Sequence, residues 1–356
     1  MPQLTEADVL KALSTVQEPE LGGNLVSRNM VKDLVIDGAK VSFTIELTTP
    51  ACPLKDEIQA RVEAALREIG VEQIQVGWGA TVRRSTPATP QTLPGVKNIV
   101  AVASGKGGVG KTTVSVNLAV ALAKAGASVG LLDADITGPN IPIMIGAKGQ
   151  PAASAEGRIT PLVASGVKVM SIDFFLPPGQ PVIWRGPLVG GAIQQFLRDV
   201  DWGELDYLVV DLPPGTSDAQ LTLAQLVPLT GAVLVTTPQE VSLADVAKAL
   251  AMFRRVSVPI LGLVENMSGF VCANCGEVTD IFGRGGGERF AAENGIDFLG
   301  GIPLDITVRQ GADVGVPAVA QSEPGPAAAA LERMARTIAG KVSIQAAREQ
   351  PILTVS

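Results

Sequence analysis

The chain has 356 residues, of which 46% are hydrophobic and 18% charged, with a net charge of −7 at pH 7. This length and composition predict about two domains with a sizeable core and exclude global disorder, while the acidic balance argues against a protein that coats nucleic acid. The chain contains no histidine, which excludes every imidazole mechanism, including a Ser-His-Asp triad and a His-ligated zinc site.

Three cysteines in so long a chain do not make a disulfide framework, and they indicate a reducing compartment. No run approaches about 18 uninterrupted apolar residues, so we expect no transmembrane helix. The N-terminus lacks a basic start followed by an apolar segment, so we expect no secretory signal. These features together favour a cytoplasmic protein.

Residues 1–84 predict a small α+β domain. Thr5 and Asp8 have the spacing of a capping box, which starts a helix, and Asp37-Gly38 is a typical hairpin turn. The expected elements are a helix to about residue 15, strands over 31–36 and 40–47, a helix over 54–69 and a short strand over 73–76.

Cys52 lies in a loop directly before the predicted helix over 54–69. A helix N-terminus lowers a thiol pKa, so Cys52 could be a reactive thiol or a transient metal ligand. The alternative is a small apolar residue that packs in a core. The following residues, 85–94, contain three prolines and predict a semi-rigid linker.

A glycine-rich phosphate-binding loop occupies residues 105–112, with the sequence Gly-Lys-Gly-Gly-Val-Gly-Lys-Thr. It follows the apolar run 98–104 and precedes a helical pattern, which is the strand–loop–helix context that the motif requires. Successive backbone N–H groups and the helix dipole attract phosphate oxygens, Lys111 would reach the β- and γ-phosphates, and Thr112 would hold Mg²⁺. The expected nucleotide contacts from this segment are Gly105, Gly107, Gly108, Val109, Gly110, Lys111, Thr112 and Thr113.

From residue 95 to about 340, strand and helix signals alternate, which predicts an α/β domain with a doubly wound, mostly parallel sheet. Ligands should gather at the carboxyl ends of its strands. A Ser-x-x-Asp cap predicts that one helix begins at Ser242, an alanine-rich helix is expected over 325–339, and residues 341–356 form a tail. The apolar strand candidates are residues 128–132, 207–210, 232–236, 260–264 and 298–302.

Two strand ends carry acids suited to nucleotide hydrolysis. Asp133 and Asp135 follow the candidate strand 128–132, and we assign Asp135 to orient or deprotonate the attacking water, with Asp133 as its partner or a partner of Mg²⁺-bound water. Asp211 ends an apolar strand in the Walker B pattern and would hold Mg²⁺ through water. The turn that follows, Pro213-Pro214-Gly215, has the character of a switch.

Base recognition is assigned to two further strand ends. Asn266 offers an amide that can donate to and accept from the adenine edge. Pro303 contributes an apolar slot, and Asp305 a carboxylate for the exocyclic amine.

Cys272 and Cys275 form a lone C-x-x-C motif, which serves redox chemistry, zinc or an iron–sulfur cluster. Two thiolates complete neither tetrahedral zinc nor a four-iron cluster, each of which takes four ligands. A symmetric dimer would supply four, so we favour a shared cluster over zinc or structural thiols.

Together these motifs resemble the Mrp/ApbC family of iron–sulfur cluster carriers, within the deviant-loop ATPase class that includes MinD, ParA and the nitrogenase iron protein. The resemblance covers about residues 5–325, and in residues 5–80 it is to the PaaD-like domain of iron–sulfur assembly factors. The residues that carry it are Pro19-Glu-Leu-Gly22, 47–54, the two lysines of the loop (Lys106 and Lys111), 133–142, 184–187, 202–216, 265–268, the cysteine pair, 281–287 and 302–309.

The resemblance implies ATP binding and hydrolysis by a homodimer that carries a [4Fe–4S] cluster to apo-proteins. It implies that Lys106 reaches across the dimer to the partner's phosphates, that Asp135 is the switch I aspartate, and that Asn266, Pro303 and Asp305 lie at base contacts. Two features depart from the family pattern. Thr137 and Asn140 replace the usual Tyr and Ser, and the cysteine motif lacks its usual histidine neighbour.

Other ATPases of the same class remain alternatives. A ParA-like partitioning ATPase would bind DNA, and a MinD-like positioning ATPase would need a basic amphipathic C-terminal helix, whereas residues 327–339 present a mostly small apolar face. In either, the cysteine pair would be a zinc or structural site. For the cluster carrier we expect apo iron–sulfur proteins and cluster assembly factors as partners, and neither nucleic acid nor membrane.

Overall fold

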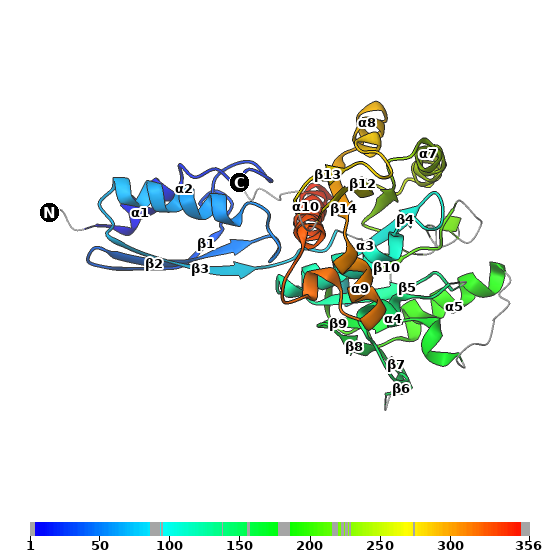
Figure 1. Ribbon diagram of the computed structural model, residues 1–356. Coiled ribbons are helices and arrows are strands. Elements are labelled where there is room, and N and C mark those ends of the chain that lie inside the picture. Colours follow the sequence, from blue (N-terminus) through cyan, green and yellow to red (C-terminus); the bar gives the residue numbers. More distant parts are fainter. Residues whose placement is uncertain are drawn as a thin grey trace. The chain divides into compact units, whose positions relative to one another are not determined.

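The computed structural model describes residues 4–85, 93, 95–136, 138–154, 157–176, 186–215, 220, 221, 224, 227, 229–272 and 275–349. The chain divides into two compact units, one of Met1–Arg83 with Ala339–Ser356 and one of Arg84–Ile338. Each unit has its own main sheet, as Figure 1 shows. No helix in the described part of the chain is long and apolar enough to cross a membrane.

The first unit packs two helices on a three-stranded sheet, which confirms the predicted α+β arrangement. The capping box is present, since the Asp8 N–H donates to Thr5 Oγ1 at 3.3 Å and the Thr5 N–H to Asp8 Oδ2 at 3.1 Å. In the sheet order β1–β2–β3 the first pair is antiparallel and the second parallel. The elements are α1 (Glu6–Leu13), β1 (Val31–Asp37), β2 (Lys40–Leu47), α2 (Lys55–Glu68) and β3 (Gln73–Ala80).

Cys52 is buried in the core of the first unit, 6% exposed. Burial raises the pKa of its thiol to about 11, and the nearby charges of Glu20 and Glu18 act in the same direction. The backbone hydrogen bond at Leu54, at the start of α2, lowers the pKa but is the smaller effect. The structure therefore supports the packing alternative for Cys52 over the reactive thiol.

We predict that Cys52 reacts slowly with iodoacetamide. In a Cys272→Ser/Cys275→Ser variant at pH 8, a thiol with a pKa near 11 instead of 9.0 forms about 100-fold less thiolate. Its labelling rate should be lower than in the same variant unfolded in denaturant by at least that factor, and should rise as the pH approaches 11. Equal rates in the folded and unfolded chains would restore the reactive-thiol interpretation.

Helix α10 (Pro326–Glu349) corrects the prediction of a tail from residue 341. Its later residues belong to the first unit, where Ser343 Oγ donates to the Ala339 carbonyl at 3.0 Å and to the Thr48 carbonyl at 3.4 Å. The contact with Thr48 comes from a residue far away in the sequence. Residues 350–356 lie outside the described residues, as does most of the predicted linker, residues 86–92 and 94.

The second unit is built on a nine-stranded sheet flanked by helices, and all five candidate strands are present in it (Figure 1). The described pairs are parallel except for two at the ends of the sheet, β8–β9 and β12–β13, which are antiparallel. Its strands, in the order β13–β12–β11–β4–β10–β5–β9–β8 with β14 also on β12, are β4 (Val96–Ser104), β5 (Val129–Asp133), β8 (Leu162–Ala164), β9 (Val167–Met170), β10 (Leu205–Asp211), β11 (Gly231–Thr236), β12 (Ile260–Val271), β13 (Val278–Thr279) and β14 (Phe298–Leu304).

Strand β4 is the point at which the chain direction reverses across the sheet. The chain passes from β4 to β5 and β9, returns to β10 beside β4, and then continues to β11 on the other side of β4. Parallel sheets bind ligands at such a switch point, beyond the carboxyl ends of the strands. The remaining elements are α3 (Lys111–Lys124), α4 (Ile141–Ile145), β6 (Ala152–Ala153), β7 (Ile159–Thr160), a 3-10 helix (Ile172–Phe175), α5 (Gly186–Asp199), α7 (Glu240–Arg255), α8 (Gly286–Glu293), α9 (Ile306–Val314) and a second 3-10 helix (Ala318–Ala320).

The predicted cap at Ser242 is wrong, because α7 begins two residues earlier, with Gln239 in the cap position. The buried Ser242 hydroxyl instead forms a 2.6 Å hydrogen bond with Thr237 Oγ1. The Ser-x-x-Asp spacing could not reveal this competing partner, which follows β11.

Candidate functional site

The glycine-rich loop joins the end of β4 to the start of α3, as predicted. Gly108 and Gly110 have φ values of 81° and 85°, a left-handed conformation that favours glycine. At position 105 glycine is required for lack of space, since a Cβ there would lie 2.1 Å from the backbone of Asp245 on α7. The loop is therefore shaped by its own dihedral angles and by close packing of α7 against it.

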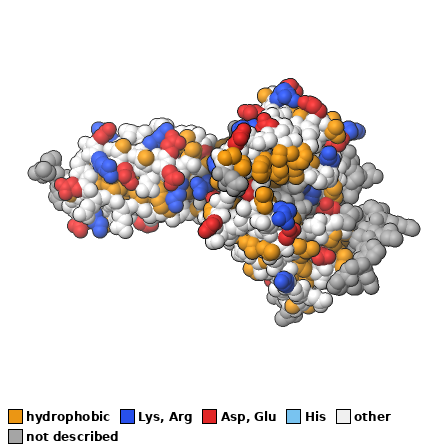
Figure 2. All heavy atoms as spheres, in the orientation of Figure 1, with side chains coloured by type: hydrophobic (Ala, Val, Ile, Leu, Met, Phe, Trp, Pro, Cys, Tyr) orange, Lys and Arg blue, Asp and Glu red, His pale blue; other side chains and the backbone are white. Residues whose placement is uncertain are grey.

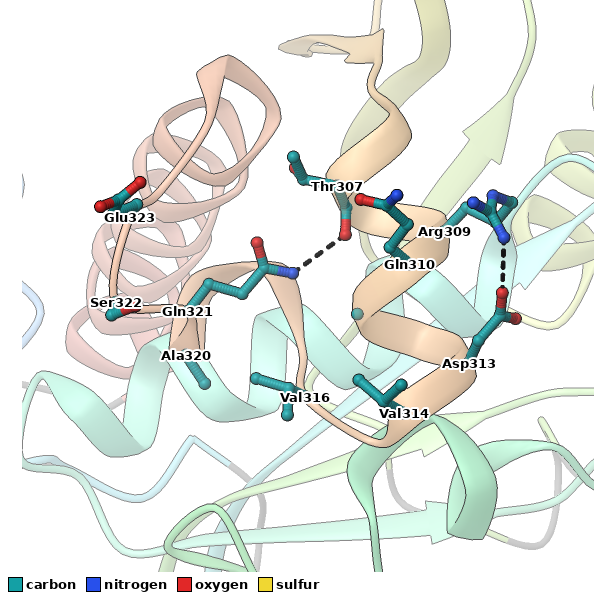
Figure 3. Close-up of a pocket in the computed structure, with 11 residues that line it drawn as sticks. Thr307, Arg309, Gln310, Asp313, Val314, Val316, Ala320, Gln321, Ser322 and Glu323 are labelled. Atoms are coloured by element: carbon teal, nitrogen blue, oxygen red, sulfur yellow. Dashed lines mark hydrogen bonds and ion pairs between the residues drawn. The ribbon is translucent and has the colours of Figure 1, made fainter.

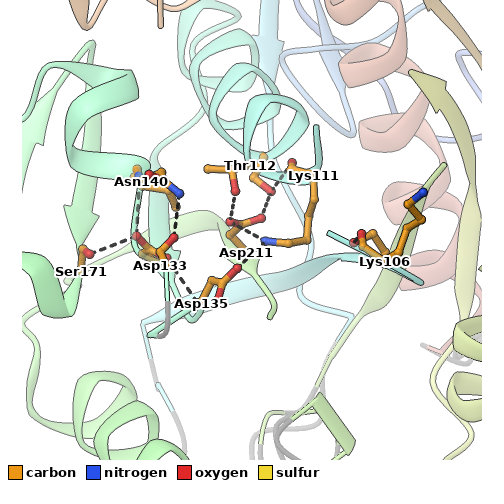
Figure 4. A network of polar contacts seen from close by, with 12 residues as sticks. Lys106, Lys111, Thr112, Asp133, Asp135, Asn140, Ser171 and Asp211 are labelled. Atoms are coloured by element: carbon orange, nitrogen blue, oxygen red, sulfur yellow. Dashed lines mark hydrogen bonds and ion pairs between the residues drawn. The ribbon is translucent and has the colours of Figure 1, made fainter. Parts of the chain in front are cut away.

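Lys111 lies between two carboxylates at the first turn of α3. Its Nζ is 2.8 Å from Asp211 Oδ2 and 3.6 Å from Asp135 Oδ2, and its side chain is 6% exposed. Figure 4 shows Lys111, Thr112 and Asp211 pointing toward one another, whereas Lys106 points away. A buried ammonium at a helix N-terminus is suited to bind phosphate oxygens.

Two hydroxyl groups fix the Asp211 carboxylate at the end of β10. Thr112 Oγ1 donates to Oδ2 at 2.7 Å, and Ser115 Oγ donates to Oδ1 at 2.6 Å. Ser115 is not among the residues predicted from the sequence, although its position three residues after Thr112 places both on one face of α3. Thr112 and Asp211 supply the hard oxygen ligands that Mg²⁺ prefers, so the residues present fit that ion.

Asp133 is buried at the end of β5, and the parallel register pairs it with Asp211 on β10. Burial, followed by the charge of Asp211, raises its pKa well above the usual value. Its carboxyl group accepts from Ser171 Oγ at 3.0 Å and from the N–H groups of Asp135 at 3.3 Å and Ile141 at 3.4 Å. Asp133 therefore anchors the segment that carries Asp135. Thr137, which with Asn140 departs from the family pattern, lies outside the described residues.

Asn266 contacts the phosphate loop directly. Its Nδ2 donates to the Val109 carbonyl at 2.8 Å, and a Cβ on Gly110 would lie 2.0 Å from the same atom. Asp305 caps α9, where its Oδ1 accepts from the Thr307 N–H at 2.8 Å and Oγ1 at 2.7 Å. These contacts place Asn266 at the phosphate loop. The assignment of Asn266 and Asp305 to base recognition stays a prediction.

Two pockets in this unit lie apart from the phosphate loop. Pro303 lines one of about 280 Å³ together with Glu265 and Ser268. The other, of about 680 Å³, lies between α9 and the segment that follows it, and Figure 3 shows Thr307, Arg309 and Gln321 around it. No loop residue from 105–112 lines either of them, so neither is the phosphate site.

The cysteine pair occupies the turn between β12 and β13. The Cys272 N–H donates to the Glu277 carbonyl and the Gly276 N–H to the Cys272 carbonyl, each at 2.9 Å. Cys272 is half-buried and Cys275 is exposed, while residues 273 and 274 lie outside the described residues. Among the described residues, no group of three or more Cys, Asp or Glu side chains could hold a metal ion. This turn thus offers two thiols at the protein surface.

The sheet carries a phosphate loop at its switch point, with a second lysine in that loop and a buried Walker B aspartate beside it. These features define a P-loop nucleoside triphosphatase of the deviant-loop class. Residues 95–339 match the family model described as NUBPL iron-transfer P-loop NTPase, and residues 6–76 match that of an iron–sulfur cluster assembly protein. The chain belongs to the NUBPL iron-transfer P-loop NTPase family.

Similar proteins agree with this placement. An iron–sulfur cluster carrier protein of Deinococcus radiodurans is 50% identical, with 96% of this chain and 97% of that protein covered. The iron–sulfur cluster transfer protein NUBPL of Dictyostelium discoideum is 45% identical, with 84% and 93% covered. A nucleotide-binding protein of Archaeoglobus fulgidus, solved with ADP, is 46% identical with a TM-score of 0.57, covering 64% of this chain and 89% of that one. The cell division ATPase MinD of Pyrococcus furiosus has a TM-score of 0.51 at 25% identity, with 68% and 98% covered.

Proposed function

We propose that this protein is an ATP-hydrolysing carrier that holds a [4Fe–4S] cluster between two copies of the chain and transfers it to apo-proteins. The supporting observation is the surface turn with Cys272 and Cys275, in a chain whose relatives are named iron–sulfur cluster carriers. In a ParA-like or MinD-like ATPase the cysteine pair would be only a zinc or structural site, whereas the names of the relatives connect it with iron–sulfur clusters.

The number of available thiols favours a dimer. A four-iron cluster takes four thiolates, and Cys52, the remaining cysteine, is buried in the first unit. Two copies related by a two-fold axis bring together two cysteine turns and complete the set. Such a cluster is transferable, because separating the copies removes half of its ligands. Zinc bound by the same four thiolates is the nearest alternative.

We assign a role in nucleotide hydrolysis to each residue of the ion-paired cluster. Lys111 and the loop N–H groups bind and orient the phosphates, and Thr112 with Asp211 would hold Mg²⁺, which supplies positive charge to the phosphate oxygens. Asp135, kept in place through Asp133, orients the attacking water and accepts its proton. Lys106 of the partner subunit would complete the site across the dimer, in accordance with its direction away from Asp211 within one chain (Figure 4).

The proposed partners are apo iron–sulfur proteins and cluster assembly factors in the cytoplasm. Relatives named cluster carrier and cluster transfer proteins, and the match to a cluster assembly protein, support these partners. Figure 2 shows positive and negative side chains interspersed on the visible face, without a continuous basic area there. This face therefore lacks the extended basic surface that is typical of nucleic-acid binding.

Anaerobic reconstitution with iron and sulfide, followed by incubation with an apo-ferredoxin, tests the proposal. We expect a broad absorbance in the blue that decreases on the carrier as it develops on the separated ferredoxin. The Cys52→Ser variant is the matched control and should behave like the wild-type protein. A colourless protein that retains zinc after the same treatment would contradict the cluster assignment.

A further inference from the structure

Strand β12 connects the phosphate loop to the cysteine turn within seven residues. Asn266 contacts the Val109 carbonyl of the loop, and Cys272 follows the last residue of the strand. Between them the strand is irregular: β14 pairs with Asn266 and then with Phe270, with a shift of register between the two. Met267 in this interval has a φ of 58°, a strained conformation for a residue other than glycine. The strand thus has a bulge where it passes from the nucleotide side to the cysteine side.

Glu265 holds this bulge together. It is fully buried, and its Oε1 accepts from Ser268 Oγ, inside the bulge, at 2.6 Å. The same carboxylate accepts from the N–H groups of Gly285 at 2.9 Å and Gly287 at 2.5 Å, at the start of α8. A Cβ on Gly287 would lie 3.0 Å from the Glu265 Cβ, so glycine permits this close approach. One carboxylate therefore fixes both ends of the segment 268–285 that contains the cysteines.

We propose that Glu265 is a positioning residue that fixes the direction of the cysteine turn and transmits the state of the phosphate loop to it through Asn266. This inference rests on the proposed function and adds a route of coupling to it. A nucleotide that alters the position of the Val109 carbonyl changes the contact of Asn266, which is adjacent to Glu265 in the same strand. The bulge is strained, and the hydrogen bonds of Glu265 hold it to the start of α8. A small shift of the bulge therefore changes the direction of the cysteine turn that follows it. If the two sites are coupled by this route, nucleotide should alter the rate of cluster release. Loss of the Glu265 hydrogen bonds should then remove this effect.

The test compares Glu265→Gln with Glu288→Gln in the reconstituted full-length protein. Both changes remove one negative charge from the same region, but Glu288 is an exposed residue of α8. The measured quantity is the rate of cluster loss to an iron chelator, with ADP and with a non-hydrolysable ATP analogue. Glu265→Gln should lose its cluster about tenfold faster than the wild-type protein, as expected for a weakened hydrogen bond to a charged group. The ratio of its rate of cluster loss with ADP to that with the ATP analogue should move toward 1. Glu288→Gln should retain the wild-type rates and ratio.

Hydrogen exchange of residues 265–282 in metal-free protein makes the test independent of the cluster. The nucleotide should alter exchange of this segment in the wild-type protein and in Glu288→Gln, but not in Glu265→Gln. If Glu265→Gln fails to fold, Met267→Gly serves instead, because glycine adopts the same φ without strain and loosens the bulge. Wild-type behaviour of the substituted protein, or a wild-type segment that does not respond to nucleotide, would overturn the inference. Failure of the wild-type protein to bind a cluster would instead count against the proposed function.

Discussion

Replacing Lys111 with alanine should abolish ATP turnover and reduce nucleotide affinity by at least about tenfold, the loss expected for one charge-assisted hydrogen bond. The change removes the cation that lies 2.8 Å from Asp211 and 3.6 Å from Asp135. The site would then present two carboxylates to an anionic triphosphate, so repulsion should add to the lost attraction. Titration with a fluorescent ATP analogue and a phosphate-release assay measure the two effects.

The Asp135→Asn variant is the matched control for the lysine substitution. It alters the other end of the same ion pair but leaves the loop, Lys111 and Asp211 in place. We expect it to bind the ATP analogue and to lose hydrolysis, because an amide cannot accept the proton of the attacking water. Equal loss of binding in both variants would contradict the separate roles assigned to Lys111 and Asp135. Thermal unfolding curves show whether each variant is folded.

The geometry of the candidate phosphate site was predictable because its residues are close together in the sequence. Gly108, Gly110, Lys111 and Thr112 occupy one short loop, and their geometry follows from backbone conformation and the start of a helix. Asp211 was predictable for a similar reason, since an apolar strand that ends in an acid places that acid at the switch point. The parallel order of the strands brings these separate motifs together.

The contacts that connect elements could not be predicted in the same way. Ser115 donates to Asp211, and Asn266 donates to the backbone of Val109, which lies 157 positions away. Ser242 has the pattern of a helix cap but bonds with Thr237 because β11 ends beside it. Such partners depend on packing between distant segments, for which a spacing rule carries no information.

Cys52 shows how burial can reverse an expectation from local sequence. Its position before α2 predicts a lowered thiol pKa, and the structure does include a backbone hydrogen bond that acts in this direction. The core around it has the larger effect and raises the pKa instead. Whether a residue at a helix start is exposed or buried depends on the tertiary fold. The cysteine turn differs, because its Cys275 is exposed.

Substituting serine for Cys272 or Cys275 should remove most of the iron from the reconstituted protein. If two copies share one four-iron cluster, each single substitution removes two of its four thiolates at once, since both copies carry the change. The reconstituted wild-type protein should hold about four irons per dimer, not per monomer. Iron and sulfide analysis with light scattering gives this ratio directly.

The control for the cysteine substitutions is Cys52→Ser, which alters a thiol of the first unit and should retain the full iron content. Each cysteine variant should still bind the ATP analogue, because Lys111 and Asp211 belong to other elements, α3 and β10. The dimer fraction of reconstituted protein should fall together with the iron content, since a shared cluster holds the two copies together. A stoichiometric cluster on a monomer, or full retention of iron after both cysteines are replaced, would show that the cluster is not held by this pair between two chains.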